Sequence, residues 1–412
     1  MMHSEKIAQQ VKSVMLGHAV ADALGVPVEF QSRERLAAAP VTDMRGFGTY
    51  PYPAGCWSDD TSMSLAALDS LCGGRYDPDD IMEKFGAWYY RDDYTPTGTL
   101  FDIGNACRTA IENYFVRRKP ASECGLSGEN SNGNGSLMRI HPFVLYAYAK
   151  NMPFSAWMPL VERASVLTHA HDRSKVGCGI YACILTALLD KPEKSAIPTA
   201  LARAEEYYRT HPEITHYRAL FSGGFADTEV AKIKSGGYVV DTLLAAVWCL
   251  LTTAGYRECV LKAVNLGEDT DTVAAVAGGL AGALYGYDAI PHEWLSVLKK
   301  RTLYRETVRA SRPRMDAGVN QKSVSARPSI APEPIMPIHS RIGVQKDRHP
   351  ARVPVFLIIW NASFSCRFES DSARVETADS SDIVSFICRF SQRGIETVSD
   401  RIGYSVSIAR VP

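Results

Sequence analysis

Two short acidic clusters, about 210 residues apart, place the strongest constraint on how this chain can fold. The first spans Ser58–Thr61 (SDDT) and the second spans Asp269–Thr272 (DTDT). If they meet, four carboxylates share one pocket and repel one another strongly unless a divalent cation neutralises them. Ligands that are all oxygen atoms favour magnesium or manganese over zinc. A fold that joins the two clusters therefore predicts a metal-dependent enzyme.

Each cluster alone also fits the start of an ordinary helix. A Ser or Asp before an apolar run caps free amides, and carboxylates in the first turn face the positive end of the helix dipole. Met63 and Leu71 continue a helical spacing after the first cluster, and Val273 and Leu280 do so after the second. A cap is the simpler interpretation of either cluster by itself, whereas the pair favours a metal site.

Six motifs together resemble the ADP-ribosylglycohydrolase family. The segment Asn265–Gly286 reads NLGEDTDTVAAVAGGLAGALYG and is similar to the signature of that family. The other matches follow in the expected order: Gly17–Gly25 with Glu29 beyond it, Trp57–Thr61, Phe101–Asn105, Asn134–Arg139 and Thr168–His171. The resemblance covers about residues 10 to 310 and says nothing about the rest of the chain.

The resemblance implies that the two clusters hold two Mg²⁺ ions, with Mn²⁺ as an alternative. The matching ligand positions are Ser58, Asp59, Asp60, Asp269, Asp271 and Thr272. Ser58 departs from the threonine that is commoner in the family, but it keeps the hydroxyl. Glu268 stands where many members have a small residue, and it either tunes metal affinity or points to solvent.

Glu29 and Asp102 are the catalytic residues that the resemblance implies. Glu29 matches a glutamate proposed to activate water or gate the site; without the resemblance it is a surface residue after a Gly-Val-Pro turn. Asp102 lies in a Phe-Asp-Ile-Gly segment similar to that of members acting on ADP-ribosyl-arginine, where the aspartate faces the guanidinium. A carboxylate suits this planar cation because it accepts two parallel hydrogen bonds. The alternative for Asp102 is the cap of a helix that begins near Gly104. Asp22 lies inside an otherwise apolar helix, and we expect it to be structural and to accept hydrogen bonds that close the core near the site.

The glycine-containing stretch before Arg139 is a candidate anion site. Its residues Asn134, Gly135 and Ser136 can present backbone amides to a pyrophosphate, although most such stretches are simple loops. His169 and His171 lack a third nearby ligand for zinc. The resemblance implies that His169 binds the ligand or neighbouring loops, and a buried, satisfied histidine is the alternative for His171.

Helical periodicity dominates the chain to about residue 310 and predicts an all-α, multi-helix domain with a metal-binding central cleft. The expected helices span residues 5–24, 61–72, 79–90, 104–117, 155–168, 175–190, 197–209, 239–254, 256–264, 271–285 and 292–302. The glycines between Val273 and Gly286 suggest close helix contacts in the core. We expect a catalytic domain over residues 5–312. Frequent prolines predict a linker and a poorly specified, irregular extension over 313–412, in which Val353–Trp360 is a possible strand or partner-binding element.

The composition is typical of a soluble enzyme. The 412 residues with 46% apolar content allow a sizeable core, and 45 basic against 45 acidic residues give no electrostatic case for nucleic acid or membrane. The chain start lacks the layout of a secretory signal, and we expect no segment with the roughly 20 apolar residues that span a bilayer. Ten cysteines without a Cys-x-x-Cys pair indicate thiols in a reducing compartment, which predicts a cytoplasmic protein.

The expected reaction combines this chemistry with the resemblance. A pair of carboxylate-held ions offers Lewis acidity and a template for vicinal hydroxyls such as a ribose diol, and an acidic residue can deprotonate the attacking water. We expect hydrolysis of the N-glycosidic bond between ADP-ribose and an arginine of a modified protein, which is the expected partner. The alternatives are an O-linked ADP-ribose, on serine or as an ester or polymer, and a non-catalytic ADP-ribose-binding or structural relative. The intact acidic clusters argue against the last, and the oligomeric state stays open.

Overall fold

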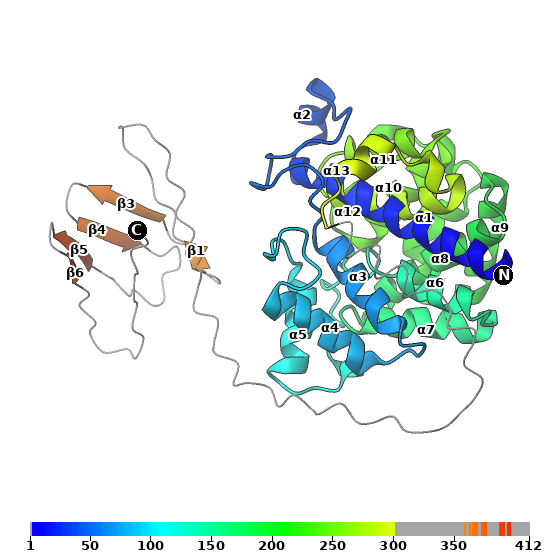
Figure 1. The fold of residues 1–412 in the computed structure, drawn as a ribbon, viewed down its shortest axis with the longest axis horizontal. Coiled ribbons are helices and arrows are strands. Elements are labelled where there is room, and N and C mark those ends of the chain that lie inside the picture. Colours follow the sequence, from blue (N-terminus) through cyan, green and yellow to red (C-terminus); the bar gives the residue numbers. More distant parts are fainter. Residues whose placement is uncertain are drawn as a thin grey trace. The chain divides into compact units, whose positions relative to one another are not determined.

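The computed structural model describes residues 2–300 and six short strands between residues 358 and 396. Its contacts divide the chain into two compact units, Met1–Gly318 and Val319–Pro412. All the α-helices of the described residues lie in the first unit, where Figure 1 shows them gathered around one another. The predicted all-α domain is therefore confirmed. The predicted limits 5–312 and 313–412 stay predictions, because the residues around that boundary lie outside the described ones.

The helices follow one another with short connections. The α-helices are α1 Met2–Gly25, α2 Arg33–Ala38, α3 Asp59–Leu71, α4 Pro78–Arg91, α5 Asn105–Phe115, α6 His141–Ala149, α7 Phe154–Val166, α8 Asp172–Asp190, α9 Ile197–Tyr208, α10 Val239–Leu251, α11 Tyr256–Val264, α12 Thr270–Tyr285 and α13 His292–Val297. The 3-10 helices are η1 Val26–Val28, η2 Ala121–Glu123, η3 Lys194–Ala196, η4 Pro212–Phe221, η5 Phe225–Asp227, η6 Val230–Lys232 and η7 Tyr287–Ala289.

The sequence predicted most of these helices. Every expected range overlaps an observed α-helix, whereas α2 and α6 were not expected. The two missed helices have 6 and 9 residues, which is too short for a clear period of 3.6. In addition, α6 is apolar on nearly every side (HPFVLYAYA), so it shows no alternation of buried and exposed faces.

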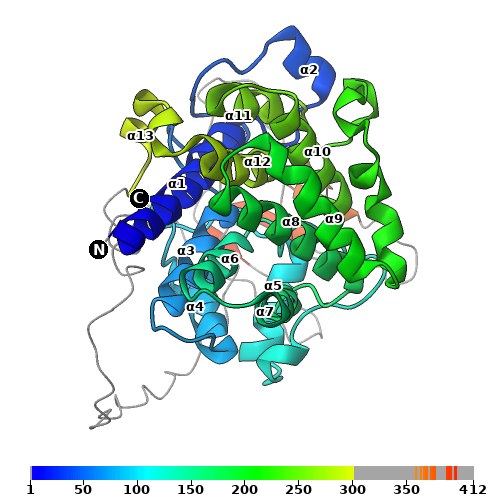
Figure 2. The same cartoon turned by 90° about the vertical axis from the view of Figure 1, so that its right-hand side faces the viewer.

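The close packing of α1 against α12 positions the site. Figures 1 and 2 both show these helices side by side. A Cβ atom on Gly278 would lie 2.4 Å from Ala21 Cβ, and one on Gly282 would lie 2.3 Å from Ser13 O. Both distances are too short for any side chain, so only glycine permits this approach. The expectation that the glycines of this segment make close helix contacts is confirmed.

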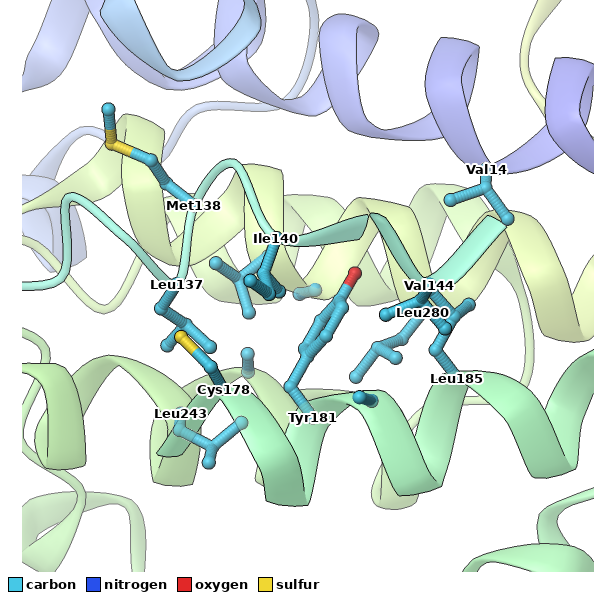
Figure 3. Packing of buried hydrophobic residues seen from close by; sticks show 14 of the residues in the cluster. Val14, Leu137, Met138, Ile140, Val144, Cys178, Tyr181, Leu185, Leu243 and Leu280 are labelled. Carbon is cyan, nitrogen blue, oxygen red and sulfur yellow. The ribbon is translucent and has the colours of Figure 1, made fainter. Parts of the chain in front are cut away.

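The core lies between α1, α6, α8 and α12. Figure 3 shows Tyr181 on α8 pointing between Ile140, which precedes α6, and Leu280 on α12. These three side chains are at most 1% exposed. A central helix surrounded by others buries apolar residues on nearly all sides, which explains the weak amphipathic pattern of α8.

The expectation that no segment is long and apolar enough to cross a membrane needs a correction. Among the described residues, the span Glu5–Val28 passes that test of length and composition. However, 94% of its apolar window is buried inside the domain, against elements such as α12. Its apolar residues are thus accounted for by the protein core.

The second unit contains short antiparallel strands. Strand β1 Ile358–Ile359 pairs with β2 Ala362–Ser363. A separate sheet has the order β3-β4-β5-β6 and is formed by β3 Ser365–Glu369, β4 Ser372–Glu376, β5 Ile387–Ser391 and β6 Gly394–Glu396. In its register Arg367 lies opposite Arg374. Strand β1 falls inside the apolar run that the sequence proposed as a strand, and the other strands were not expected.

Candidate functional site

The first acidic cluster lies at the start of α3. Ser58 is the N-cap: its Oγ accepts a hydrogen bond from the backbone N–H of Asp60 at 3.3 Å, and it also donates to Asp60 Oδ2 at 3.0 Å. Asp59 and Asp60 occupy the first turn, near the positive end of the helix dipole, and both are buried. The capping interpretation is therefore correct for Ser58, and it leaves the two carboxylates facing the interior.

Asp22 of α1 fixes the position of this helix start. Its carboxylate accepts hydrogen bonds from Ser58 N at 2.9 Å, from Thr61 N at 3.1 Å and from Thr61 Oγ1 at 2.6 Å. Asp22 is 0% exposed, and a buried carboxylate needs such donors. The expectation that Asp22 closes the core near the site by accepting hydrogen bonds is confirmed.

The second cluster lies at the start of α12 and is held differently. Asp269 is the N-cap residue, but its side chain caps no amide of the helix. Its Oδ2 instead accepts a hydrogen bond from Asn134 Nδ2 at 2.7 Å, and its backbone N–H donates to Ser235 O at 3.0 Å. Thr270 Oγ1 donates to Gly25 O at 2.8 Å. Three distant segments thus position this helix start.

The two clusters meet in the folded domain. Thr272 Oγ1 donates a hydrogen bond to Asp60 Oδ2 at 3.2 Å, between residues 212 positions apart in the chain. Asp60 therefore receives one hydroxyl from each helix start, Ser58 from α3 and Thr272 from α12. The juxtaposition on which the sequence hypothesis depends is present.

A pairing of two loops brings Glu29 to the second cluster. Phe30 N donates to Glu268 O at 2.7 Å, and Glu268 N donates to Gln31 O at 2.8 Å. Thr49 Oγ1 donates to the backbone oxygen of Glu29 at 2.6 Å. Glu29 is only 5% exposed, so it is not the surface glutamate that the sequence left as an alternative.

Glu29, Asp102 and Asp271 form a compact acidic group. One carboxylate oxygen from each lies within 4.8 Å of the other two. The hydroxyl of Tyr50 lies near both Glu29 and Asp102, and the Tyr50 ring lies 5.0 Å from that of Phe101. Asp102 has a φ of 55°, a left-handed conformation that aspartate tolerates better than most residues. An aromatic support thus holds these carboxylates together.

Burial and mutual repulsion raise the pKa values of these carboxyl groups. Desolvation, followed by the charges of neighbouring carboxylates, raises the pKa values of Asp60 and Asp271 well above their usual range, and Asp59 behaves likewise. Burial, then Asp102 and Asp269, raises the pKa of Glu29 to about 10. Burial, then Asp269, raises that of Asp102 to about 6. The site therefore concentrates more negative charge than this environment supports.

The donor set fits hard divalent cations. Three carboxylate oxygens are enclosed and have no hydrogen-bond partner among the described residues: Glu29 Oε2, Asp60 Oδ1 and Asp271 Oδ2. Buried anionic oxygens without partners cost free energy, and a divalent cation would supply the missing partner. A donor set made of oxygen atoms suits magnesium or manganese. Because Glu29 and Asp102 belong to the same group, the acidic site extends beyond the six matched ligand positions.

A glycine-containing loop lies beside the second cluster. Asn134 N donates to Gly237 O at 3.0 Å, while the Asn134 side chain supports Asp269. The N–H groups of Gly135 and Ser136 donate to no acceptor within the described part of the chain. Ser136 is 0% exposed, and its Oγ accepts a hydrogen bond from Ser165 Oγ at 2.9 Å. The backbone of Ser136 is therefore enclosed too, and the free N–H of the partly exposed Gly135 is the better donor to a ligand.

The sequence model of the ADP-ribosylglycohydrolase family matches residues 3–321. The chain belongs to the ADP-ribosylglycohydrolase family. It is accordingly a hydrolase of this family, and the resemblance seen in the sequence motifs is confirmed.

Curated relatives and a solved structure agree with this membership. The chain is 35% identical over 292 residues to "ADP-ribosylarginine hydrolase Tri1" of Pseudomonas putida, covering 71% of this chain and 74% of that protein. It is 30% identical over 300 residues to "ADP-ribosyl-(dinitrogen reductase) glycohydrolase" of Rhodospirillum rubrum, covering 72% and 92%. A solved structure titled "ADP-ribosylglycohydrolase-related protein complex" superposes with a TM-score of 0.62 at 33% identity, covering 74% and 98%.

In this ADP-ribosylglycohydrolase, several open alternatives are now decided. Helix α5 begins at Asn105 with Gly104 as its N-cap and has no side-chain cap, so Asp102 does not cap it. His171 caps α8, because its Nδ1 accepts from Arg173 N at 3.1 Å, and its Nε2 contacts Glu129 Oε2 at 3.1 Å. Glu268 is exposed and points to solvent.

The sequence reasoning missed two contributors to the site. Tyr50, which links Glu29 to Asp102, lies in a loop with no motif or period to mark it. The Asn134 side chain was assigned to ligand binding together with its loop, yet it supports Asp269. Only the contact between distant segments reveals either role.

Proposed function

We propose that this ADP-ribosylglycohydrolase cleaves the N-glycosidic bond between ADP-ribose and an arginine side chain of a modified protein. The observation that carries the proposal is the approach of Glu29, Asp102 and Asp271 to within 4.8 Å of one another. This approach places Asp102, whose carboxylate suits a guanidinium, next to the carboxylates of Glu29 and Asp271, which suit cations and a sugar. Relatives named "ADP-ribosylarginine hydrolase Tri1", at 35% and 33% identity, support the arginine linkage.

The ions belong to the same proposal. The residues that would hold two Mg²⁺ are Ser58, Asp59, Asp60, Asp269, Asp271 and Thr272. When bound, magnesium, or manganese in its place, supplies Lewis acidity and a template for the ribose hydroxyls. The enclosed oxygens of Asp60 and Asp271 without hydrogen-bond partners support this assignment.

Glu29 is the proposed general base. A base must be ionised to accept a proton, yet burial and neighbouring carboxylates raise the pKa of Glu29 to about 10. Positive charge in the acidic group lowers this pKa and makes the carboxylate available. The neighbouring hydroxyl of Tyr50 also lowers the pKa of Glu29, which favours the ionised form. The ionisation of Glu29, and therefore its activity as a base, thus depends on the net charge of the surrounding acidic group.

Asp102 is the proposed recognition residue for the leaving guanidine. Its carboxylate accepts parallel hydrogen bonds from the guanidinium. As the bond between C1 and nitrogen breaks, the electron pair stays on the guanidine nitrogen and the water oxygen bonds to C1. The proton of the water passes to Glu29, which lies close enough to Asp102 to return a proton to the leaving group.

The test uses the full chain after chelation, with and without added magnesium. Arginine-ADP-ribosylated and serine-ADP-ribosylated proteins are supplied separately, and free ADP-ribose is measured. We expect release from the arginine-linked substrate in the presence of magnesium. Release from the serine-linked substrate alone would favour the O-linked alternative, and release from neither would overturn the proposal.

The Asp102→Ala variant tests the arginine assignment more narrowly. We expect turnover of the arginine-linked substrate to fall about a hundredfold, because a charge-assisted bidentate contact is lost. Binding of free ADP-ribose, measured by calorimetry, should change much less. Equal losses of turnover and ADP-ribose affinity would remove Asp102 from guanidinium recognition.

A cytoplasmic location and an ADP-ribosylated protein as partner complete the proposal. The cysteines of the described residues are free thiols, which supports a reducing compartment. The names of the relatives support a modified protein as the substrate.

A further inference from the structure

Arg139 is a fully buried cation that makes no ion pair with a carboxylate of the described residues. It is 0% exposed, and its Nη2 donates to Ala164 O at 3.2 Å and to Thr168 Oγ1 at 2.6 Å. Its Nε and Nη1 are enclosed and have no hydrogen-bond partner among the described residues. A guanidinium stays charged when buried, and burying it without an anion is costly. The Phe85 ring, whose centroid lies 5.0 Å from the guanidinium carbon, and the two hydrogen bonds of Nη2 offset part of this cost.

The Thr168 hydroxyl links Arg139 to His169. Thr168 Oγ1 lies 2.9 Å from His169 Nδ1. Because Arg139 can only donate, the Thr168 oxygen accepts that bond and has a single proton to give. The competing acceptor is the Cys107 thiol, which also contacts Thr168, but sulfur is a weak acceptor. Donation of the Thr168 proton to the stronger acceptor, His169 Nδ1, is therefore favoured, and it would place the proton of the neutral imidazole on Nε2.

The Nε2 atom of His169 is open to a ligand. It has no hydrogen-bond partner among the described residues and is not among their enclosed, unpaired atoms. By contrast, the Nε2 atoms of His18 and His141 are enclosed and have no hydrogen-bond partner among the described residues. A Cβ atom on Gly135 would lie 2.9 Å from His169 Cε1 and 3.5 Å from Nε2, so the imidazole packs directly on the loop with the free amides.

We propose that Arg139 and Thr168 are positioning residues that fix His169 as an Nε2–H donor toward an anionic oxygen of the ligand. The neighbouring N–H group of Gly135 offers a further donor to the same anion. The tautomer assignment does not depend on the proposed function. The nature of the anion, a pyrophosphate oxygen of ADP-ribose, rests on the proposed function.

Thr168→Val tests this proposal with little change of side-chain volume. The full chain is labelled with ¹⁵N-histidine, and long-range proton–nitrogen spectra report which ring nitrogen carries the proton; His169→Gln identifies the signal. We expect the proton on Nε2 in the wild type and a mixture of tautomers in Thr168→Val. ADP-ribose affinity, measured by calorimetry with magnesium present, should fall about tenfold because a fixed donor to a charged group is lost. Thr168→Ser keeps the hydroxyl and should restore both.

Two results would overturn the proposal. One is a wild-type His169 with its proton on Nδ1. The other is a Thr168→Val variant with wild-type tautomer and wild-type affinity for ADP-ribose. If neither linkage is hydrolysed while tautomer and affinity change as expected, the proposed function fails and the positioning roles stand.

Discussion

The starts of α3 and α12 bring carboxylates to the same place by different means. At α3, Ser58 caps its own helix, and the Asp22 carboxylate of the neighbouring α1 accepts a hydrogen bond from the Ser58 backbone N–H. At α12, Asp269 makes no such cap, and Asn134 and Ser235 from distant loops hold it. The first start combines a local side-chain cap with hydrogen bonds to Asp22, whereas the second has no side-chain cap and depends on the assembled domain.

The carboxylates at the two starts are alike even though their support differs. Asp60 accepts a hydrogen bond from Ser58 Oγ at 3.0 Å, and Asp271 accepts one from Thr272 N at 2.9 Å. Each also keeps an enclosed oxygen without a partner among the described residues, and burial followed by neighbouring carboxylates raises the pKa of both well above the usual range. We infer that both helix starts gain from a bound cation and that they differ in the donors that position them.

The largest expected effect comes from removing one charge at either start. Asp60→Asn and Asp271→Asn should each lower magnesium affinity and turnover by about a hundredfold or more, because each removes an anionic ligand. In metal-free protein, Asp271→Asn should raise the melting temperature, since it relieves repulsion. Thermal unfolding with chelator and with magnesium measures both effects. A metal-free Asp271→Asn protein less stable than wild type would contradict the repulsion between buried carboxylates at this site.

Substitutions of Asp22 and Asn134 compare how the starts of α3 and α12 are supported. Asp22→Asn should destabilise the domain by about 2 kcal/mol with or without magnesium, because three donors lose an ionised acceptor. Asn134→Ala should cost less stability but weaken magnesium binding about tenfold, as for other groups that orient a ligand. Urea unfolding and magnesium titration compare the variants. Equal profiles would show that the two starts are not built differently.

The pH dependence of the metal-free protein reports on the same buried carboxyl groups. The pKa values of Asp102, about 6, and Glu29, about 10, lie above the value of about 4 expected in the unfolded chain. The stability from these protons is fully present below about pH 4 and is lost as pH rises through about 6 and about 10. We expect the free energy of unfolding to fall by up to about 1.4 kcal/mol per pH unit for each proton, and magnesium to remove most of the fall. Urea unfolding across this range with chelator measures it, and a rise with pH would contradict the account.

The smallest effect is expected at Glu268, beside the second start. Its side chain points to solvent, so Glu268→Gln should leave magnesium affinity and turnover within about twofold of wild type. This variant is the matched control for Asp271→Asn because both remove one negative charge near α12. A loss comparable to that of Asp271→Asn, seen in the same titration, would place Glu268 in the acidic group.

The sequence predicted what local patterns encode. The long helices and the roles of Ser58 and Asp22 follow from period, capping preference and the cost of burying a carboxylate. Tyr50 and the Asn134 side chain could not be predicted, because their partners are chosen by contacts between distant segments. The short α6 escaped prediction because a nearly all-apolar helix has no amphipathic period.

Magnesium titration by calorimetry, on chelated full-length protein and on Asp60→Asn and Asp271→Asn, tests the central claim most directly. If carboxylates from both helix starts hold the ions, the wild type binds two equivalents and each variant loses saturable binding at one of them or both. Absence of saturable binding in the wild type, or unchanged binding in both variants, would contradict the account.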